Sequence, residues 1–494
     1  MMKILMVSPR YPDTYWSFRH ALKFISKKTS NPPLGLMTVA AMLPREWEIK
    51  LVDLNVRPLL DEEIIQADFV FISAMSVQAE SVSEVIRRCR KFHAKIVAGG
   101  PLFTGDPDSY SDLDHLILNE AEITLPRFLA DLVQNKPKPV YRTEDFANMQ
   151  DSPVPDYSLI NVSDYAQLSL QYSRGCPHAC EFCEITALLG HRVRVKTSDQ
   201  ILSELETIFD TGFRGSVFFV DDNFIGNRRK LKEDLLPAVS QWIGEHRYPF
   251  SFTTEASIDL ADDPDLMKAM VMAGFEKVFV GIETPEVESL KECNKRLNME
   301  HDLLESVHKI QLAGIEVSAG FIVGFDHDTS NIFQRQIDFI QQSGIITAMV
   351  GLLIAPSRTK LFQRLKSEGR IIHTSDGNNT NFTMNFIPRM DKEKLMKGYA
   401  HIVTTIYSNK AYYQRLKGFL KNFKPGARAY TRITMEKIRA LLRSIYVIGI
   451  LGKGRFYFWK LFLWSLIRKP KVFPMAITYS IYGYHFKKVY RIED

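Results

Sequence analysis

Short runs of apolar residues recur along the first 140 positions, and helical stretches separate them. Each run is continuous rather than alternating, which is typical of parallel strands that are covered on both faces. The five runs are Ile4–Pro9, Lys50–Leu54, Phe69–Met75, Lys95–Gly100 and His115–Glu120. Between them, Pro33–Leu43 and Ala79–Phe92 have helical character. This alternation predicts a Rossmann-like, doubly wound α/β domain over residues 1–140.

Ligands of such sheets bind at the carboxyl ends of the strands. In this chain those ends carry mainly small and hydroxyl residues, which let a large ligand lie close to the backbone. The residues are Ser73, Ser76, Gly99, Gly100 and, after the fifth run, Glu120.

A polar, proline-containing stretch, residues 141–165, is predicted to be a linker, and a second alternating series follows it. Its six apolar runs are Leu168–Tyr172, Ser216–Val220, Phe250–Thr254, Lys277–Ile282, Glu316–Val323 and Ile346–Ile354. Six strand–helix units over about 200 residues favour an open, partial (β/α)6 barrel rather than a closed eight-stranded one. We assign this barrel to residues 166–393 and expect its chemistry at the carboxyl ends of the strands.

The chain has 494 residues, of which 45% are hydrophobic and 24% charged, a composition that excludes disorder and suits about three domains. Five cysteines give no disulfide framework, and the N-terminus turns polar too soon for a secretory signal. We therefore expect a reducing, cytoplasmic setting. Two of the cysteines, Cys89 and Cys293, stand alone and are expected only to pack.

From residue 394 to 494 the strand pattern is lost, aromatic side chains mix with Lys and Arg, and we expect a helical extension. Residues 411–494 contain 18 Lys and Arg against 3 Asp and Glu, whereas residues 1–410 contain 45 and 54. No window of 18 uncharged apolar residues exists to span a bilayer. Two interpretations stay open: a segment lying in the membrane interface on the cytoplasmic face, or a helical cap whose aromatics pack on the barrel. Long aliphatic runs beside the aromatics disfavour nucleic acid as a partner.

The other three cysteines lie within eight positions, directly after the first strand of the predicted barrel. Cys176, Cys180 and Cys183 form the spacing C-x3-C-x2-C. Thiolates are the protein ligands of iron–sulfur clusters, and three of them can hold three irons of a cubane and leave the fourth open. The alternative is a zinc site closed by His178 or His191, although no second cysteine pair of the usual zinc spacing exists.

With this spacing after the first strand of a partial barrel, the chain resembles the radical S-adenosylmethionine (SAM) superfamily over about residues 165–355. The resemblance implies a 4Fe–4S cluster on the three cysteines, SAM at its open iron, and cleavage of SAM to a 5′-deoxyadenosyl radical. An electron donor of the flavodoxin or ferredoxin type would supply the electron. Residues that match the family's SAM-holding elements are Asp221, Asn223, Glu255, Ser257, Gly281 and Glu283.

A Rossmann-like domain ahead of such a barrel resembles the cobalamin-binding subclass of the superfamily. The resemblance implies that cobalamin binds at Ser73, Ser76, Gly99, Gly100 and Glu120. The D-x-H-x-x-G motif, whose histidine ligates cobalt in other cobalamin proteins, is absent from this domain. That absence puts ligation of cobalt by a histidine in doubt. The alternative to cobalamin binding is a degenerate domain that only supports the barrel.

The whole layout is most similar to the hopanoid C-2 methyltransferases and their relatives, and the front segment Arg10–Phe18 contributes to that likeness. The resemblance implies a cobalamin-dependent methyltransferase that places a methyl group on an unactivated carbon of a membrane lipid, a hopanoid at C-2. SAM would be used twice, once to methylate cobalamin and once as the source of the radical. The front segment either lines an apolar substrate cavity or covers the sheet edge.

Two alternatives to this function stay open. The enzyme could use radical chemistry without methyl transfer, in cyclisation, carbon–carbon coupling or tetrapyrrole side-chain modification. It could instead be a non-catalytic metal-binding protein that binds lipid or tetrapyrrole. The residues assign no general acid or base, and they leave the carbon attacked and the lower ligand of cobalt undetermined.

Overall fold

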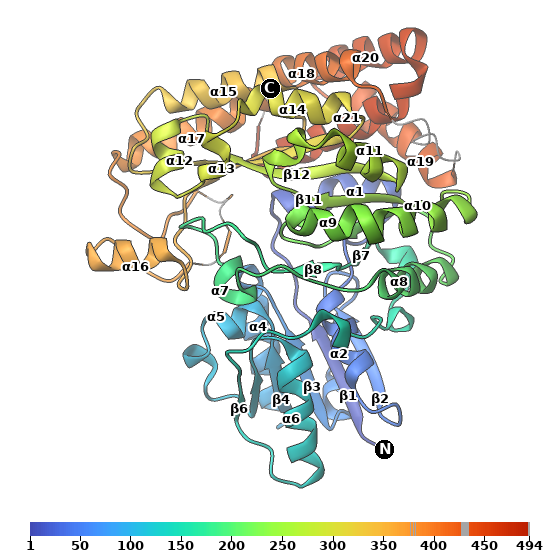
Figure 1. Ribbon diagram of the computed structural model, residues 1–494, viewed down its shortest axis with the longest axis vertical. Helices are drawn as coiled ribbons and strands as arrows, with labels where there is room; N and C mark the ends of the chain where they lie inside the picture. The colour runs from blue at the N-terminus through green and yellow to red at the C-terminus, as the bar shows by residue number, and fades with distance from the viewer. Residues whose placement is uncertain (376, 379, 381, 426–433, 493–494) are drawn as a thin grey trace.

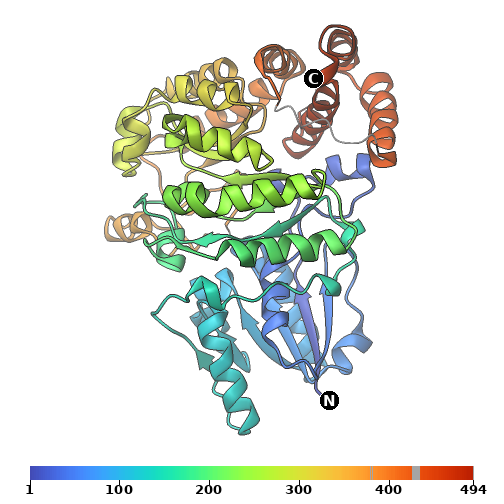
Figure 2. The same ribbon diagram turned by 45° about the vertical axis from the view of Figure 1, so that its right-hand side comes forward.

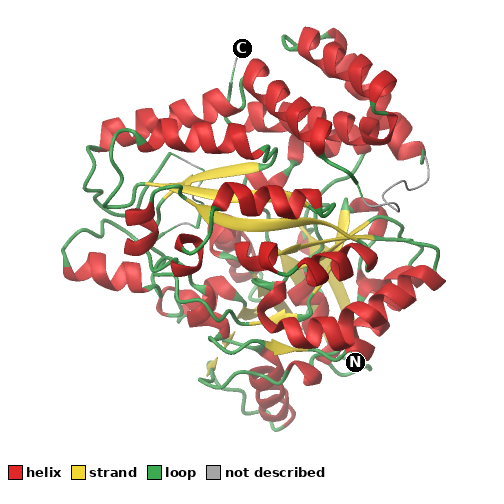
Figure 3. Ribbon diagram, turned by 45° about the horizontal axis from the view of Figure 1, so that its top comes forward, coloured by secondary structure: helices red, strands yellow, loops and turns green. Residues whose placement is uncertain are grey.

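The computed structural model describes residues 1–375, 377–378, 380, 382–425 and 434–492. They form two parallel β-sheets flanked by helices, followed by a group of helices at the C-terminal end (Figure 1 and Figure 3). This is the α/β fold class that the alternating pattern predicts. Two parts of the predicted C-terminal extension, residues 426–433 and 493–494, lie outside the described residues.

The first sheet has six parallel strands in the order β2-β1-β3-β4-β5-β6. Their bounds are β1 (Lys3–Ser8), β2 (Glu48–Asp53), β3 (Phe69–Ser73), β4 (Lys95–Gly99), β5 (His115–Ile117) and β6 (Val140–Tyr141). The first five are the predicted strands, and β6 is a two-residue edge strand that the sequence pattern did not predict. The strand order reverses between β1 and β3, which is where open α/β sheets bind their ligands.

Two clusters of buried apolar side chains cover the two faces of this sheet. In β3, Val70 and Ile72 belong to one cluster and Phe69 and Phe71 to the other, because successive strand residues point to opposite faces. Burial on both faces explains the continuous apolar runs. The helices of this part of the chain are α1 (Arg19–Ile25), α2 (Leu34–Met42), α3 (Asp61–Ile65), α4 (Ala79–Lys91), α5 (Pro101–Gly105) and α6 (Ala121–Val133).

The second sheet has six parallel strands that follow one another in chain order. They are β7 (Gln167–Leu170), β10 (Ser216–Phe219), β11 (Ser251–Glu255), β12 (Phe275–Glu283), β13 (Glu316–Val323) and β14 (Ala348–Leu352). Among the described residues the edge strands β7 and β14 pair with no further strand, so the barrel stays open between them. A small antiparallel ribbon, β8 (Ser173–Arg174) and β9 (Arg194–Val195), accompanies it.

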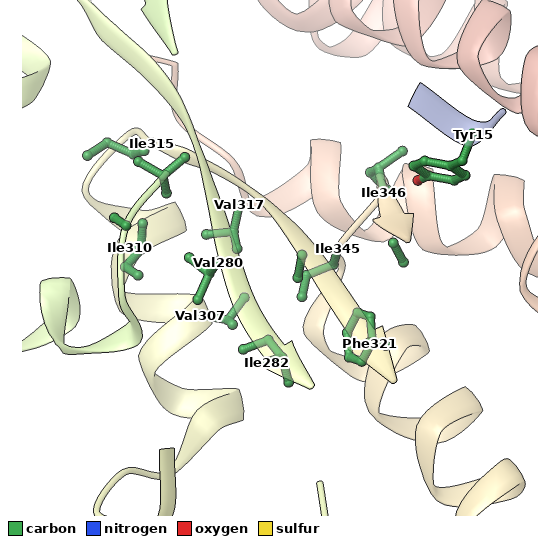
Figure 4. Close-up of a cluster of buried hydrophobic side chains, with 14 of the residues drawn as sticks. Tyr15, Val280, Ile282, Val307, Ile310, Ile315, Val317, Phe321, Ile345 and Ile346 are labelled. Atoms are coloured by element: carbon green, nitrogen blue, oxygen red, sulfur yellow. The ribbon is translucent and has the colours of Figure 1, made fainter. Parts of the chain in front are cut away.

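The outer face of the barrel is packed against helices. Figure 4 shows Val280 and Ile282 of β12 and Val317 of β13 near Val307 and Ile310 of the neighbouring helix, and all five are at most 1% exposed. Full burial of such a side chain stabilises the fold by roughly 1.5–3 kcal/mol. The helices are α7 (Ile185–Leu189), α8 (Ser198–Asp210), α9 (Arg228–Lys230), α10 (Leu236–Glu245), α11 (Pro264–Met272), α12 (Val287–Glu292), α13 (Arg296–Met299), α14 (Leu303–Leu312), α15 (Ile332–Ser343) and α16 (Lys360–Ser367).

The C-terminal extension is helical, as predicted, and Figure 2 shows it at the opposite end of the molecule from the first sheet. Its helices are α17 (Lys392–Ile406), α18 (Asn409–Asn422), α19 (Met435–Ser444), α20 (Arg455–Arg468) and α21 (Phe473–Val489). None of the described helices combines the length and the apolar character needed to cross a membrane. The domain boundaries that we expect at residues 140, 165 and 393 stay predictions.

N-terminal residues lie between the two open edges of the barrel. Beside β7, the Ala166 N–H donates to the carbonyl of Thr29 (3.0 Å). Towards β14, the Tyr15 hydroxyl lies 2.9 Å from the Tyr407 hydroxyl, which donates to the carbonyl of Ala348 (2.7 Å). The segment between Tyr15 and Thr29 therefore connects both edge strands, with help from the C-terminal helices.

Candidate active site

The three clustered cysteines lie on one loop that connects β8 to β9. Cys176, Cys180 and Cys183 are free thiols of intermediate exposure. Gly175, just before the first of them, has a φ of +94°, and a Cβ there would lie 2.6 Å from the carbonyl oxygen of Arg192. Only glycine fits this turn, which brings the beginning and the end of the loop together.

This thiol set fits a cluster better than a single metal ion. Burial raises the pKa of each thiol, in Cys183 to about 12, and the Lys295 ammonium opposes these shifts. Among the described residues no three His, Cys, Asp or Glu side chains converge closely enough to hold one ion. His178 and His191 therefore complete no preformed zinc site in the described part of the chain. Three thiols spread along one loop can each meet a different iron of a cluster.

Two bidentate ion pairs fix the ribbon beside this loop to the first domain. Arg174 of β8 donates to both carboxylate oxygens of Glu122 (3.0 and 2.9 Å). Arg194 of β9 donates to both oxygens of Glu120 (2.8 and 2.7 Å). Both carboxylates are only 4% exposed, so removing one arginine would leave a buried charge, at a cost of about 3–5 kcal/mol. The edge of the first sheet is thereby held against the cysteine loop.

The barrel holds the loop from the other side. Glu181, next to Cys180, accepts two hydrogen bonds from Arg364 of α16 (2.8 and 3.0 Å). Its backbone N–H donates to the carbonyl of Cys293 (2.9 Å). Cys293 is buried, as expected, and it also anchors the loop through its backbone. Sequence reasoning missed Arg364, which lies 183 positions from Glu181 and is marked by no motif.

Three carboxylates gather after β10 and at the end of β11. Burial raises the pKa of Asp221 to about 7, of Asp222 to about 6 and of Glu255 to about 8. Asp221 is already occupied, because it accepts the backbone N–H groups of Tyr172 (3.1 Å) and Ser173. One oxygen of Asp222 is buried without a hydrogen-bond partner among the described residues. A positively charged ligand would satisfy this end of the sheet.

Two further residues predicted for SAM connect the same strand ends. The side-chain amide of Asn223 donates to the hydroxyl of Ser257 (3.3 Å). Ser257 in turn donates to a carboxylate oxygen of Asp259 (2.6 Å). Asn223 is buried and Ser257 is half-buried, so this chain of bonds keeps the loops after β10 and β11 together next to Asp222.

The end of β12 carries an ion pair close to the cysteines. Glu283 has a φ of +63°, which is uncommon outside glycine, and its buried carboxylate lies 2.9 Å from the Lys295 ammonium. A Cβ on Gly281 would meet that carboxylate and the Lys295 ammonium, so any side chain there would displace the ion pair. Lys295 was also missed by sequence reasoning. Its charge lowers the pKa of all three thiols and favours the thiolates that bind metal.

At the first sheet, most of the residues predicted for cobalamin lie side by side on the ligand edge. Ser73 ends β3 and Gly99 ends β4. Gly100 has a φ of +92°, and a Cβ there would lie 2.7 Å from the Ser73 hydroxyl. Ser76 begins the turn after β3, whereas the carboxylate of Glu120 is taken by Arg194. Contact of these five residues with cobalamin stays a prediction.

The same edge presents two apolar side chains that sequence reasoning did not single out. Tyr11 follows β1 and Met75 follows β3, at the point where the strand order reverses, and they are 40% and 51% exposed. The Tyr11 hydroxyl lies 3.8 Å from the Met75 sulfur. A surface of small residues flanked by two exposed apolar ones fits a broad, flat ligand such as a corrin ring.

Comparison with known protein families divides the chain in the same way as the fold. Residues 25–129 match a B12 binding domain, residues 170–340 match the radical SAM superfamily, and residues 359–493 match a domain of unknown function (DUF4070).

Curated relatives match nearly the whole chain. An uncharacterized methyltransferase of Synechocystis is 41% identical, and the match spans 98% of this chain and 91% of that protein. The hopanoid C-2 methylase of Rhodopseudomonas palustris is 35% identical, and the match spans 94% of this chain and 90% of that protein. A bacteriochlorophyllide d C-12(1)-methyltransferase of Chlorobaculum tepidum is 24% identical and covers 78% and 85%.

Two solved structures share the fold. The cobalamin-dependent SAM radical enzyme OxsB with aqua-cobalamin bound has a TM-score of 0.64 at 14% identity and covers 99% of this chain and 80% of its own. The radical SAM methyltransferase TsrM of Kitasatospora setae, with cobalamin and a 4Fe–4S cluster bound, has a TM-score of 0.58 at 14% identity and covers 76% and 77%.

The two sheets, the cysteine loop and the matched domains define a radical SAM enzyme with a cobalamin-binding domain. Within that class, the chain belongs to the methyltransferase family that includes the hopanoid C-2 methylase, because it is 35% identical to that protein over 90% of its length. The predicted family, enzyme class and cofactors are confirmed: a 4Fe–4S cluster, SAM and cobalamin.

Proposed function

We propose that the enzyme places a methyl group on an unactivated carbon of a membrane lipid, a hopanoid at C-2. The identity of 35% to the hopanoid C-2 methylase, over nearly its full length, supports this substrate. The bacteriochlorophyllide methyltransferase is less similar, at 24% identity, which favours a lipid over a tetrapyrrole.

The observation that carries the proposal is the way both domains hold the cysteine loop between them. Arg174 and Arg194 join that loop to carboxylates after β5, so the cobalamin edge and the cysteine loop face each other. When bound, the cluster and SAM supply a radical that abstracts hydrogen, and cobalamin supplies the methyl group. A saturated ring carbon has no lone pair or double bond for polar methylation, so both groups must reach one carbon. The task of the chain itself is to hold the ligand edge of the first sheet in a fixed position relative to the cysteine loop of the barrel.

On the barrel edge, Asp222 joins the predicted SAM contacts. Asp221 holds the beginning of the cysteine loop, and the unpartnered oxygen of Asp222 next to it suits the ammonium of SAM. A cation would also stabilise the ionised forms of Asp222 and Glu255, whose pKa values burial has raised. The remaining proposed contacts are those of the sequence: Asn223, Ser257, Gly281 and Glu283.

Apolar side chains are proposed to meet the substrate inside the barrel. Val278 and Val280 of β12 belong to the buried cluster under the helices, so alternation places Phe279 on the inner face. Trp16 of the front segment lies edge-on to Phe279 with ring centroids 5.3 Å apart, and it is 43% exposed. The front segment would then both line the substrate cavity and cover the open edge.

The proposal also implies two partners. Reductive cleavage of SAM needs a one-electron donor, for which a protein of the flavodoxin or ferredoxin type is suited. A lipid substrate further implies that the enzyme works at the cytoplasmic face of a membrane.

Anaerobic incubation with methyl-labelled SAM and a bacterial lipid extract, followed by mass spectrometry, tests the substrate. We expect a labelled hopanoid heavier by one CH2, together with 5′-deoxyadenosine, and no label in the Cys180→Ala blank. Label in an added tetrapyrrole instead would replace the lipid as substrate. Loss of hydrogens from the product without any label would contradict methyl transfer.

A further inference from the structure

The C-terminal helices differ in which way their apolar side chains face. Helices α17, α18 and α21 bury theirs against the barrel and one another, as a helical cap would. The buried aromatics on these helices include Tyr399, Tyr412, Phe419, Tyr479 and Phe486, and Tyr407, just after α17, is buried too. Helices α19 and α20 instead carry exposed large apolar residues. Both helices lie at the margin of the molecule (Figure 1).

These outward residues form a stripe on each of the two helices. On α19 and the π-helical turn that continues it, the stripe recurs every three or four positions, which is one helix face. Its members are Met435, Ile438, Leu442, Tyr446 and Ile450, between 37% and 64% exposed. On α20 the corresponding residues are Phe456, Leu463 and Ile467, between 52% and 74% exposed. With Leu451 and Leu466, this apolar stripe holds 10 of the 26 large hydrophobic residues that are exposed in the described chain.

The charge around the stripe is strongly positive. Residues 435–471 contain nine Lys and Arg and a single acid, Glu436, which pairs with Lys27 (3.2 Å). Lys453, Arg455 and Lys460 are exposed and have no acidic partner among the described residues. A second copy of the chain would bring two such positive surfaces together, which disfavours self-association. An anionic bilayer offers both headgroups for the cations and an acyl boundary for the apolar stripe.

We propose that α19 and α20 are a membrane-docking surface that inserts its apolar stripe into the interface of an anionic bilayer. The surface also lies next to the barrel's open side. Arg443 of α19 donates to the hydroxyl of Ser26 (2.9 Å), just after α1, and α1 follows the front segment that carries Trp16. This part of the inference rests on the proposed function: a lipid that leaves the bilayer at α19 meets α1 and then the barrel.

Flotation with vesicles tests the docking surface. The full-length protein is mixed with vesicles of phosphatidylcholine containing phosphatidylglycerol, and with phosphatidylcholine alone. We expect the protein to float with the anionic vesicles, and the triple variant Phe456→Ser, Leu463→Ser, Ile467→Ser to lose at least tenfold in vesicle affinity. The matched control replaces three apolar residues elsewhere that are at least 61% exposed, Ile65→Ser, Val133→Ser and Leu312→Ser, and should float like the wild type.

The role of the positive charge is tested with one triple variant, Lys453→Glu, Arg455→Glu and Lys460→Glu. This variant should float poorly on anionic vesicles, and added salt should weaken wild-type binding. Flotation of the stripe variant like the wild type would overturn the proposal. A second result would also overturn it: the wild type does not float but forms a concentration-dependent dimer, and the triple serine variant abolishes that dimer. The apolar stripe would then bind a second copy of the chain.

Lipid methylation separates this inference from the proposed function. The stripe variant should methylate lipid delivered in detergent at the wild-type rate but lipid in vesicles at least tenfold more slowly. Equal rates in vesicles would overturn docking while leaving the function intact. Vesicle binding without methylation of any lipid, in vesicles or in detergent, would leave docking intact and contradict the function.

Discussion

The two sheets present ligand edges of opposite character. The barrel edge is crowded with ionisable groups, including the half-buried Asp222 and Glu255 and the Lys295 ammonium near the thiols. The edge of the first sheet carries only small residues at Ser73, Gly99 and Gly100, and the carboxylates Glu120 and Glu122 beside it are engaged by arginines. We propose that charge holds SAM and the cluster at the barrel edge, while small residues accommodate the corrin at the edge of the first sheet. Arg174 and Arg194 join the two edges, and we propose that the edges form one site.

The largest expected effect comes from the barrel edge alone. Cys180→Ala removes one of three thiolates, so the cluster absorbance should disappear and 5′-deoxyadenosine formation should fall at least a thousandfold, while cobalamin still binds. Absorbance spectra and product chromatography under anaerobic conditions measure this. The control is Cys89→Ala, which changes a buried cysteine of α4, beside the first sheet and outside the loop. Near-normal SAM cleavage by Cys180→Ala would contradict the role of the loop.

Weakening the Arg194–Glu120 ion pair, which joins the two edges, should uncouple SAM cleavage from methyl transfer. Arg194→Ala leaves the buried Glu120 with only the more distant Arg174 (3.9 Å) as an ion-pair partner, so we expect methylated product to fall about 10- to 100-fold relative to 5′-deoxyadenosine. Arg194→Lys, which keeps the charge but loses the two-pronged geometry, should lie between. The control Arg90→Ala breaks an exposed ion pair with Asp112 on the first domain and should change neither product. An unchanged product ratio in Arg194→Ala would mean that the ion pair does not align the cofactors.

A smaller effect is expected from a substitution of Gly100 at the ligand edge of the first sheet. Gly100→Ala places a Cβ 2.7 Å from the Ser73 hydroxyl at a backbone φ of +92°, so the ligand surface must distort. Cobalamin affinity, followed by absorbance titration, should weaken about tenfold, and SAM cleavage should be unaffected. Gly105→Ala is the control, because nothing lies within 4 Å of its Cβ. Unchanged cobalamin binding would separate this edge from the cofactor.

The smallest effect is a pH dependence at the barrel edge. Burial raises the pKa of Glu255 from 4.5 to about 8, so its proton is held more tightly in the folded protein. Its stabilising contribution is present below pH 4.5 and is lost as the pH rises through 8. In SAM-free protein, Glu255→Gln should therefore flatten the fall in unfolding free energy between pH 5 and 8, by about 1–3 kcal/mol. Denaturant unfolding measures this, with exposed Glu288→Gln as control. A wild-type slope in the variant would contradict burial of an ionisable Glu255.

The features that could be predicted from the sequence are those that local patterns of residues determine. The continuous apolar runs located the strands because parallel strands are covered on both faces, and the spacing of Cys176, Cys180 and Cys183 located the cluster loop. Lys295 and Arg364 escaped prediction, because they reach the loop only when distant segments meet. Glu120 shows the same limit: its position at a strand end was predictable, but its partner Arg194 lies 74 positions later.

The central claim, that the two edges form one site, is tested most directly by electron paramagnetic resonance. The protein is loaded anaerobically with the cluster and cob(II)alamin, and the relaxation of the cobalt signal is measured with the cluster oxidised and reduced. We expect faster cobalt relaxation when the cluster is reduced and therefore paramagnetic, and a weaker effect in Arg194→Ala. A cobalt signal that relaxes identically in both cluster states would contradict it.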